Sequence, residues 1–402
     1  MREVQARTAD VVVIGGGVNG VSVAFQLAKR GVRDIVLLER RQLGAGATGK
    51  SGALVRCHYA NIPEAQLALE SLRIFRAWED EIGAGSPGFE ATGFIQVVSP
   101  EDETRLRSNV AAQQAIGVET SVVSATDLRE IEPLMRTDDL TVAAFEPGSG
   151  FADPNATLYG FAAAAVERGV RIRTETAAIR LLEEGGRITG VETTDGAIAT
   201  RTVVLAGGSW ADRLLTPLGL DYGLTPVRVQ VAIFRWPPEI DGGRRHRVVI
   251  DATRHSWFRP EGPASTLIGA ELGVSTTDPD ALDETLDQQC IETGRAALSA
   301  RFPAFAKATM RGGWAGTFMR SPDGHPIIDR IPSIDGLYCV AGDSGTSFKT
   351  APAIGVCLAE WIVDGAARLV DLSPFRSTRF AEGRPWLDEL AYGDDRQLTI
   401  SR

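Results

Sequence analysis

The sequence predicts a mixed α/β fold in which a domain with a parallel sheet is interleaved with a mostly antiparallel β domain. Three observations lead to this prediction. Residues 10–39 have the pattern of a strand, a glycine-rich turn, a helix and a second strand. The same alternation returns at Asp153 and again near the C-terminus, which suggests one domain made of three separated stretches. Between them, residues 223–273 consist of short β-type runs separated by proline and glycine.

The other elements follow from the spacing of apolar residues. Helices are expected over residues 64–83, 101–117, 125–131, 156–169, 279–300 and 351–364, with a further one starting at Trp210. Strands are expected over residues 93–99, 170–174, 202–208 and 336–342. We expect the 101–117 helix to be charged and exposed, and Asn155 to cap the helix over 156–169.

Composition and charge narrow the class of protein. The 402 residues exceed one ordinary domain, and 44% of them are hydrophobic, as in globular proteins. The net charge of −10 disfavours nucleic acid and anionic membranes as partners, and no apolar run reaches the roughly 20 residues of a membrane span. The first ten residues lack the apolar segment of a signal peptide. A cytoplasmic protein is therefore expected.

The cysteines give no sign of a metal centre. The four of them, Cys57, Cys290, Cys339 and Cys357, show neither a CxxC pair nor the Cys/His spacing of a zinc site. We interpret them as reduced thiols, as is usual in the cytosol, and predict no metal site.

The glycine-rich turn has the form Gly15-x-Gly17-x-x-Gly20, with Val18 and Asn19 inside it. Gly15 allows the tight turn out of the strand, Gly17 allows close approach of a pyrophosphate, and Gly20 lets the helix pack against the strand. The phosphates of a dinucleotide would then lie at the positive end of the helix dipole. The second strand ends in Glu39, whose carboxylate can bind a ribose diol. The sequence therefore predicts a dinucleotide site.

Two later segments favour FAD over NAD. Residues 45–56, AGATGKSGALVR, directly follow the second strand and are rich in small residues, as expected of a segment that wraps an extended ligand. Residues 340–349, VAGDSGTSFK, form a second glycine-rich turn before the last helix and offer another backbone and dipole site. Glu39 disfavours a 2′-phosphate, although Arg40 and Arg41 beside it weaken that argument.

Taken together, these segments resemble the D-amino-acid oxidase (DAO) superfamily of FAD enzymes. The chain is most similar to the branch with sarcosine oxidase, glycine oxidase and related secondary-amine dehydrogenases. The resemblance covers nearly the whole chain and rests on GGGVNG, GATGKSGALVRCHY, TVVLAGGSW, WFRPEG, SPDGHPIID and AGDSGTSFKTAPAIG in this order. It implies a Rossmann-type FAD-binding domain of glutathione-reductase type, formed by residues 1–85, 145–222 and 316–402. Residues 86–144 and 223–315 would form the substrate-binding domain.

The resemblance also implies which residues hold FAD. Glu39 and the three motif glycines would bind the ADP half, Arg40 would lie near the adenosine, and the 342–349 turn would face the pyrimidine edge of the flavin. The full set is Gly15, Gly17, Val18, Asn19, Gly20, Glu39, Arg40, Ala47, Thr48, Lys50, Ser51, Gly52, Ala178, Ala206, Gly207, Gly208, Trp210, Gly342, Gly345, Thr346, Ser347, Phe348 and Lys349.

Two cations are the main candidates for substrate binding. Arg56 and Lys349 match the arginine and lysine that clamp the substrate carboxylate in sarcosine oxidases. An arginine fork suits a planar carboxylate, which would place the substrate C–H over the flavin. His58 and Tyr59 follow Arg56 closely and are candidate pocket residues, whereas His325 is expected to cap or pack. His246 and His255 are expected to face solvent.

Two departures from the family are informative. Gly316 stands near the position where monomeric sarcosine oxidase carries its flavin-tethering cysteine, so non-covalent FAD is predicted. Leu267 stands at the position where the family's oxidases place a lysine over the flavin. The sequence therefore leaves open whether the enzyme is an oxidase or a dehydrogenase.

The leading functional hypothesis is an FAD-dependent amine oxidoreductase. It would move a hydride from an N-substituted glycine or other amino acid bearing a carboxylate to flavin N5, and the imine would hydrolyse to an amine and an oxo acid such as glyoxylate. Oxidation of a 2-hydroxy acid or a D-amino acid is the alternative, and a flavoprotein subunit of a multi-enzyme complex is a second one. The oligomeric state is not predicted. Apolar pocket walls could come from residues that are equally candidates for the core: Phe94, Ile95, Val231, Phe234, Trp257 and Trp314.

Overall fold

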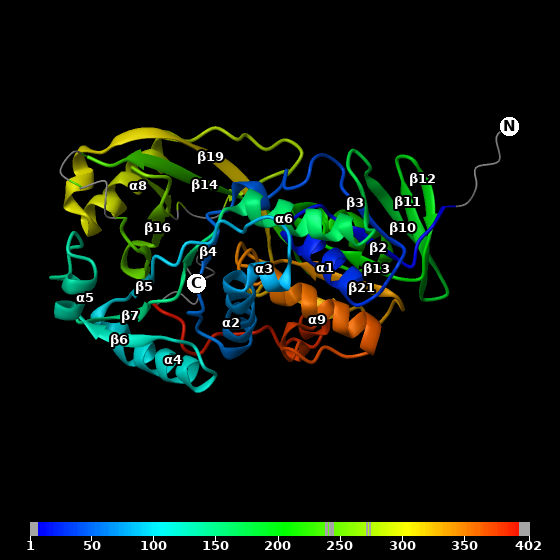
Figure 1. The fold of residues 1–402 in the computed structure, drawn as a ribbon, viewed down its shortest axis with the longest axis horizontal. Helices are drawn as coiled ribbons and strands as arrows, with labels where there is room; N and C mark the ends of the chain where they lie inside the picture. Colours follow the sequence, from blue (N-terminus) through cyan, green and yellow to red (C-terminus); the bar gives the residue numbers. More distant parts are fainter. Residues whose placement is uncertain (1–6, 238–239, 241–244, 271, 273–274, 394–402) are drawn as a thin grey trace.

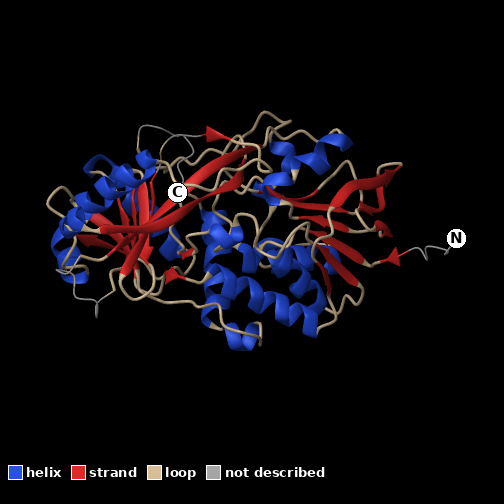
Figure 2. Cartoon of the chain, turned by 90° about the horizontal axis from the view of Figure 1, so that it is seen from above, coloured by secondary structure: helices blue, strands red, loops and turns tan. Residues whose placement is uncertain are grey.

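Two large sheets lie at opposite ends of the molecule, with helices on and between them (Figures 1 and 2). The structure is a computed structural model and describes residues 7–237, 240, 245–270, 272 and 275–393. One sheet has six strands and the other nine. The mixed α/β fold predicted from the sequence is confirmed.

The six-stranded sheet is the parallel sheet expected around the glycine-rich turn. Its order is β20-β21-β13-β2-β3-β9, and only the β20–β21 pair is antiparallel. The bounds are β2 (Val11–Ile14), β3 (Ile35–Leu38), β9 (Arg171–Arg173), β13 (Val203–Leu205), β20 (Ile327–Arg330) and β21 (Leu337–Ala341). Strands β2, β3, β13 and β21 are thereby brought side by side from three separate stretches of the chain.

Both faces of this sheet are covered, which explains its unbroken apolar strands. Val11 and Val13 pack with α1 (Val18–Lys29), α6 (Pro154–Glu167) and α9 (Ala351–Asp364). Val12 and Ile14 point the other way. They pack against a sheet formed by β1 (Arg7–Thr8), β10 (Ala178–Glu184), β11 (Arg187–Thr193) and β12 (Gly196–Ala199).

The nine-stranded sheet is antiparallel except for the β15–β5 pair. Its order is β18-β14-β17-β16-β15-β5-β7-β6, with β19 also paired to β14. The bounds are β5 (Phe94–Val97), β6 (Ser121–Ser124), β7 (Val142–Glu146), β14 (Thr225–Arg235), β15 (Val248–Asp251), β16 (Ser256–Pro260), β17 (Ser265–Ala270), β18 (Ser275–Thr276) and β19 (Thr309–Arg320). The predicted domain limits stay a prediction.

The two faces of the nine-stranded sheet pack against different parts of the molecule. Ile95, Phe234 and Ile268 pack on one face with α8 (Gln288–Arg301) in a closed core. Alternate residues on the same strands, such as Val231 and Leu267, form a smaller apolar cluster on the opposite face. That second face looks toward the parallel sheet and supplies one wall of the site described below.

The remaining α-helices and strands lie outside the three sheets described above. They are β4 (Leu54–Val55), β8 (Gly150–Phe151), α2 (Ile62–Arg76), α3 (Trp78–Glu81), α4 (Glu103–Ala115), α5 (Ala125–Ile131) and α7 (Asp212–Leu215). The single helix expected over 64–83 is interrupted at Ala77. The helix expected to be exposed over 101–117 buries Leu106, Asn109 and Gln113, so that prediction was wrong for its inner face.

Two further expectations need correction. The cap of α6 is Asp153, whose Oδ1 accepts the Ala156 N–H at 2.7 Å, and Asn155 lies inside the helix. The helix expected from residue 279 begins at Gln288. The preceding residues form a turn and irregular backbone, and Arg228 on β14 donates to the carbonyls of Asp283 and Thr285, which removes those carbonyls from helical pairing.

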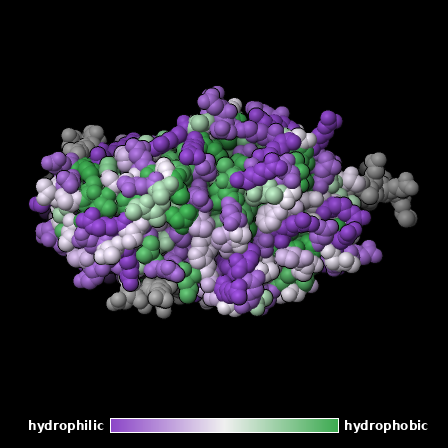
Figure 3. All heavy atoms as spheres, turned by 90° about the horizontal axis from the view of Figure 1, so that it is seen from below, coloured by the Kyte–Doolittle hydropathy of each residue, from purple (hydrophilic) through white to green (hydrophobic). Residues whose placement is uncertain are grey.

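None of the described helices combines the length and apolar character that a membrane crossing requires. The face shown in Figure 3 is a mixture of hydrophilic and hydrophobic side chains. Within the described residues, no group of three or more His, Cys, Asp or Glu side chains is placed to hold a metal ion.

Candidate active site

A cavity of about 440 Å³ lies between the two sheets and is lined by residues from both. The parallel sheet contributes the glycine-rich turn after β2 and the ends of β3, β13 and β21. The nine-stranded sheet contributes Val231, Ile250, Trp257 and Gly269. The cavity therefore begins at the carboxyl ends of parallel strands, where α/β folds bind nucleotides, and ends against an apolar wall.

The glycine-rich turn is a cradle that side chains would fill. Gly15 has φ +115°, and a Cβ there would overlap the carbonyl oxygen of Ala206. A Cβ on Gly20 would overlap the carbonyl oxygen of Gly15, so Gly20 packs α1 against the turn and does not itself line the cavity. At the start of α1, Val18 N–H donates to Thr48 Oγ1 at 3.0 Å. The N-terminal end of a helix thus points into the cavity, which suits a phosphate group.

Glu39 lies at the end of β3, beside this turn. Its Oε2 accepts the Gly16 N–H at 2.8 Å and its Oε1 accepts the Arg41 N–H at 2.7 Å. These main-chain bonds fix the carboxylate at the cavity wall, where a ribose could meet it.

Next to Glu39, the Arg40 guanidinium lies 4.2 Å from the centre of the Trp210 ring. Asp280 accepts hydrogen bonds from Arg40 (2.6 Å), from Trp210 Nε1 (2.8 Å) and from Arg213. A few residues on, Glu284 pairs with Lys50. Residues 278–287, called the strap below, therefore cross from the nine-stranded sheet to the cofactor half of the cavity. The sequence did not single out Asp280.

The turn after β21 closes the other end of the predicted cofactor site. Gly342 and Gly345 have φ of +62° and +80°, and α9 starts shortly after them. Burial raises the pKa of Asp343, although the hydrogen bond from Ser347 opposes the shift. Asn19 Nδ2 donates to Ser347 Oγ at 2.9 Å, while Asn19 Oδ1 is buried with no hydrogen-bond partner in the described chain. That oxygen is left for a bound ligand.

Arg56 and Lys349 lie together at the end of this cavity, 2% and 7% exposed. The Arg56 guanidinium is 4.7 Å and the Lys349 ammonium 5.2 Å from the centre of the Tyr59 ring. In the described chain each cation donates to a main-chain carbonyl, Arg56 to His58 O and Lys349 to Thr346 O. Arg56 Nε is buried with no hydrogen-bond partner among the described residues. The structure thus brings both predicted clamp residues to the same tyrosine ring at the edge of the cavity.

The electrostatics of this pair favour an anionic ligand. Burial and the neighbouring Arg56 guanidinium hold the pKa of Lys349 well below its usual value. A carboxylate placed between the two groups would restore the preference of Lys349 for its charged form.

The predicted neighbours of the pair have a different position. Neither His58 nor Tyr59 lines the cavity. Burial, and then the Arg56 guanidinium, lower the pKa of His58 to about 3, although a hydrogen bond with Gln113 opposes the change. His58 is therefore neutral at ordinary pH. The two residues contact Arg56 from behind and do not face the space where a ligand would lie.

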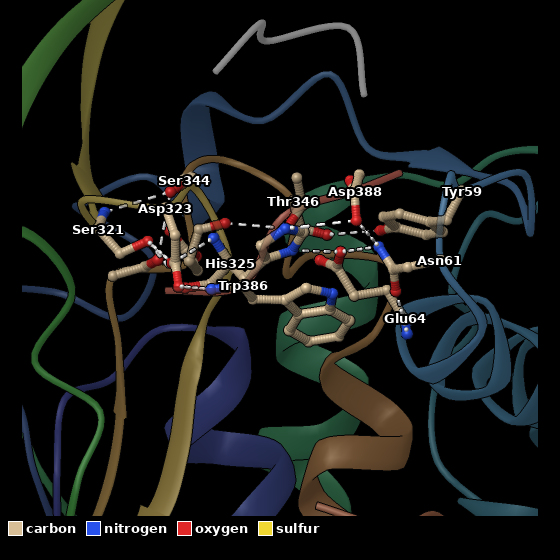
Figure 4. Close-up of polar contacts among 12 residues, drawn as sticks. Tyr59, Asn61, Glu64, Ser321, Asp323, His325, Ser344, Thr346, Trp386 and Asp388 are labelled. Atoms are coloured by element: carbon tan, nitrogen blue, oxygen red, sulfur yellow. Dashed lines mark hydrogen bonds and ion pairs between the residues drawn. The ribbon is translucent and has the colours of Figure 1, made fainter. Parts of the chain in front are cut away.

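The other histidines also lie away from the cavity. His246 is buried in the core against Phe258 and Phe302, with a pKa lowered by burial to about 4, so the expectation that it faces solvent was wrong. His325 is buried between the Trp386 ring and the carboxylates of Glu64 and Asp388 (Figure 4). The packing role expected for His325 matches this position.

Most predicted cofactor residues line the cavity, and Gly20 is the exception. Of the candidate wall residues, Val231, Trp257 and Trp314 line it, whereas Ile95 and Phe234 belong to the core on the far side of the sheet. Phe94 lies beneath the Arg56 guanidinium, 5.6 Å away. Asn109, Gln113 and Tyr392 also support the Arg56–Tyr59 segment, and no sequence motif marked them.

Comparison with known proteins gives the family. The model of the family described as DAO, FAD dependent oxidoreductase, matches residues 10–361. The chain belongs to this family. Its cofactor is therefore FAD, and the fit is visible in the cradle at Gly15 and Gly20 and in the unpartnered Asn19 oxygen.

The relatives of this DAO-family protein are amine and amino-acid enzymes. It is 26% identical to mitochondrial dimethylglycine dehydrogenase of Rattus norvegicus, covering 94% of this chain and 46% of that protein. It is also 26% identical to sarcosine oxidase subunit beta of Rhizobium meliloti, covering 93% and 89%. The L-proline dehydrogenase structure from P. horikoshii superposes with a TM-score of 0.86 at 27% identity, covering 95% and 100%. The chain thus spans about half the length of the dimethylglycine dehydrogenase it matches.

Proposed function

We propose that this DAO-family protein is an FAD-dependent amine oxidoreductase whose substrate is an N-substituted glycine or another amino acid with a free carboxylate. One observation carries the proposal: Arg56 and Lys349 are both buried against the Tyr59 ring and both line the cofactor cavity. Buried cations without a carboxylate partner are costly unless a ligand supplies one. A substrate carboxylate would do so and would leave the rest of the substrate against Val231, Ile250 and Trp257.

The residues of this chain would bind and orient the substrate. The Arg56 fork and the Lys349 ammonium would hold the two carboxylate oxygens, and the apolar wall would exclude water from the carbon next to nitrogen. FAD, when bound, accepts the hydride from that carbon at flavin N5. The imine product would leave for water and hydrolyse to an amine and an oxo acid, or to an aldehyde.

An amine substrate is favoured over a hydroxy acid because no histidine lines the described cavity to act as a base. Oxidation of a 2-hydroxy acid needs a group that accepts the hydroxyl proton, and histidine is the usual one. None of the four histidines lines the cavity, and His58, the nearest to Arg56, has a pKa of about 3. A neutral amine has no such proton to lose before the hydride leaves.

We further propose that FAD is held without a covalent bond. Neither a cysteine nor a histidine is among the described residues that line the cavity. The position that matches the tethering cysteine of monomeric sarcosine oxidase is Gly316, which packs against Lys50. Denaturation in acid should therefore release all of the flavin into the supernatant.

Reoxidation by oxygen is expected to be slow. Leu267, at the position of the lysine in the family's oxidases, is fully buried in the apolar cluster with Val231, Ile250 and Trp257. Lys50 and Lys349 are the lysines that line the described cavity, and Lys50 is paired with Glu284. This arrangement favours a dehydrogenase that passes electrons to another acceptor.

The test is anaerobic mixing of the FAD-loaded protein with each candidate substrate. Reduction of the flavin is measured as the loss of its visible absorbance. Sarcosine, N,N-dimethylglycine, proline and D-alanine represent the amines, and lactate represents the hydroxy acids. We expect bleaching with at least one amine and none with lactate, and slow return of colour in air. The Arg56→Lys variant keeps the charge but loses the fork, so its KM should rise roughly 10- to 100-fold.

The matched control is Arg73→Lys, because Arg73 is an exposed arginine on α2. It should behave like the wild-type protein. Failure of every carboxylate-bearing amine to bleach the flavin would show that the substrate class is wrong, and bleaching by lactate alone would favour the hydroxy acid.

A further inference from the structure

The C-terminal segment of the described chain, residues 386–393, runs behind the Arg56–Tyr59 segment. In Figure 1 it is the red chain that leads from the region below α9 toward β5, β6 and β7. Trp386 stacks on His325 with ring centres 4.3 Å apart, and Asp388 accepts a hydrogen bond from Asn61 at 3.1 Å (Figure 4). Further along, Gly393 N–H donates to Asp102 at 2.9 Å. The segment is therefore anchored at both ends.

Tyr392, near the end of this segment, makes the closest approach to the site. Its hydroxyl lies 2.7 Å from His58 Nε2, and the two rings stack with centres 5.9 Å apart at 16°. Asn109 Nδ2, from α4, donates to the same hydroxyl at 2.9 Å. The Tyr392 hydroxyl therefore shares one hydrogen bond with His58 Nε2 and a second with Asn109. His58 Nδ1 is buried without a hydrogen-bond partner among the described residues, so the contact with Tyr392 holds the polar edge of the ring.

His58 also contacts Arg56 through its main chain. The Arg56 guanidinium donates to the main-chain carbonyl of His58. The Phe94 ring contacts both residues, 6.4 Å from the His58 ring centre and 5.6 Å from the guanidinium. Gln113 Nε2 donates to the Tyr59 carbonyl at 2.8 Å, which fixes the next residue as well. The Arg56 guanidinium and the His58 ring therefore pack against the same Phe94 ring, and a shift of His58 would also shift the carbonyl to which Arg56 donates.

We propose that Tyr392 is a positioning residue that sets the orientation of Arg56 through His58, so that the C-terminal segment determines how tightly a substrate carboxylate is bound. This proposal rests on the proposed function, because it assigns a task at the same site. It also gives α4 a part in that site through Asn109.

The variant Tyr392→Phe tests the proposal with little risk to the fold. It keeps the ring that stacks on His58 and removes only the hydroxyl. Without that hydroxyl His58 Nε2 loses its partner, so His58 is held less firmly and Arg56 should lose its preferred direction. We expect the dissociation constant of phenylacetate, a carboxylate with an apolar body, to rise about 5- to 20-fold, as for the loss of one or two ordinary hydrogen bonds. The measurement is the change in flavin absorbance on titrating the FAD-loaded protein.

A positioning role also predicts a particular kinetic pattern. KM for the amine that bleaches the flavin should rise with the phenylacetate constant, while the limiting rate of anaerobic reduction stays within about two-fold. FAD content should match the wild-type protein, and Tm should fall only slightly, because buried hydrogen bonds of one hydroxyl are lost. Tyr159→Phe is the control, because Tyr159 is a half-exposed tyrosine on α6, away from the cavity lining.

A second variant, Asn109→Ser, removes the donor behind Tyr392. If both residues act through His58, the double variant should be little worse than Tyr392→Phe alone, because residues of one network are not additive. Additive effects, unchanged phenylacetate binding in Tyr392→Phe, or a loss of FAD from that variant would each overturn the proposal. If the wild-type protein bound phenylacetate while Tyr392→Phe bound it equally well, the proposed function would stand and only the positioning role would fail. Absence of binding to the wild-type protein would count against both.

Discussion

At the scale of single residues, the site buries two cations for which the described residues provide no ion pair. Arg56 and Lys349 are buried within reach of the same tyrosine ring, and each donates to a main-chain carbonyl in the described chain. Such a pair costs folding free energy and lowers the pKa of the lysine. The cost is offset when an anion binds, which is how a binding site differs from a structural ion pair.

Lys349→Met should therefore separate stability from binding. In the folded protein the pKa of Lys349 is lowered, so the unfolded chain binds more protons and the stability rises with pH toward the ordinary value of 10.5. The variant lacks this group, so it should be more stable than the wild-type protein at neutral pH, with a difference that shrinks as the pH approaches that value. Its KM for the amine should rise roughly 10- to 100-fold.

The measurement for this variant is Tm in the absence of substrate from about pH 6 to about pH 9, with KM measured separately. Lys307→Met, at a lysine that does not line the cavity, is the control and should show no such pH trend. A Tm that falls in Lys349→Met at every pH would contradict the account of its charge.

At the scale of elements, the strap at residues 278–287 is the clearest example of a tertiary contact that changes local structure. Its sequence was expected to be helical from residue 279, yet Arg228 and Gln230 of β14 hold it in a non-helical form. In that form Asp280 reaches Arg40, Trp210 and Arg213. The strap thereby links the nine-stranded sheet to the predicted adenosine end of the cavity.

Asp280→Asn should weaken FAD binding without unfolding the protein. The amide keeps the size of the side chain but loses its charge, so Arg40 and Trp210 are less firmly held. Exposed ion pairs contribute up to about 1 kcal/mol each, so the dissociation constant of FAD should rise roughly 3- to 10-fold. Titration of the apoprotein with FAD, followed by flavin fluorescence, measures this.

Asp335→Asn is the matched control for this prediction. Asp335 also forms an exposed pair with an arginine, Arg330, and neither lines the cavity. Equal dissociation constants for the two variants would contradict the role of the strap.

At the scale of the whole molecule, the site lies between the two sheets, and the C-terminal chain is anchored beside the parallel sheet. The anchor is Arg379, which is 1% exposed and forms a two-pronged ion pair with Asp323 at 2.7 and 3.0 Å. The same guanidinium donates to the carbonyl of His325 at 2.9 Å. Burial alone would raise the pKa of Asp323, but Arg379 holds it below its usual value. The segment SPDGHPIID is therefore an anchor for the C-terminal chain.

Arg379→Met should destabilise the whole protein. It leaves the Asp323 carboxylate buried without its cation, which costs about 3–5 kcal/mol of unfolding free energy. Arg376→Met, three residues earlier, removes an exposed pair with Glu382 and should cost at most about 1 kcal/mol. Urea unfolding of the FAD-loaded variants measures both. Similar losses of unfolding free energy in the two variants would show that the buried Arg379 pair stabilises the protein no more than the exposed Arg376 pair does.

Much of the cofactor half could be predicted because it is local in sequence. Gly15, Gly17 and Glu39 lie within one strand–turn–helix–strand unit, where spacing alone fixes their relation. Prediction of the Arg56–Lys349 clamp required the family resemblance, because the two residues are almost 300 positions apart in the sequence. The supports of the clamp could not be predicted at all, because Asn109, Gln113 and Tyr392 approach it from a helix and a C-terminal segment with no motif.

The sequence by itself determined the parallel sheet, the glycine-rich cradle and the family, because apolar periodicity and glycine spacing act over short stretches of chain. Only the tertiary structure decided which side chains surround Arg56, that 278–287 is a strap, and that His58 is neutral and turned from the cavity. Those properties depend on burial and on partners distant in the chain, and both are set only when the two sheets are packed together.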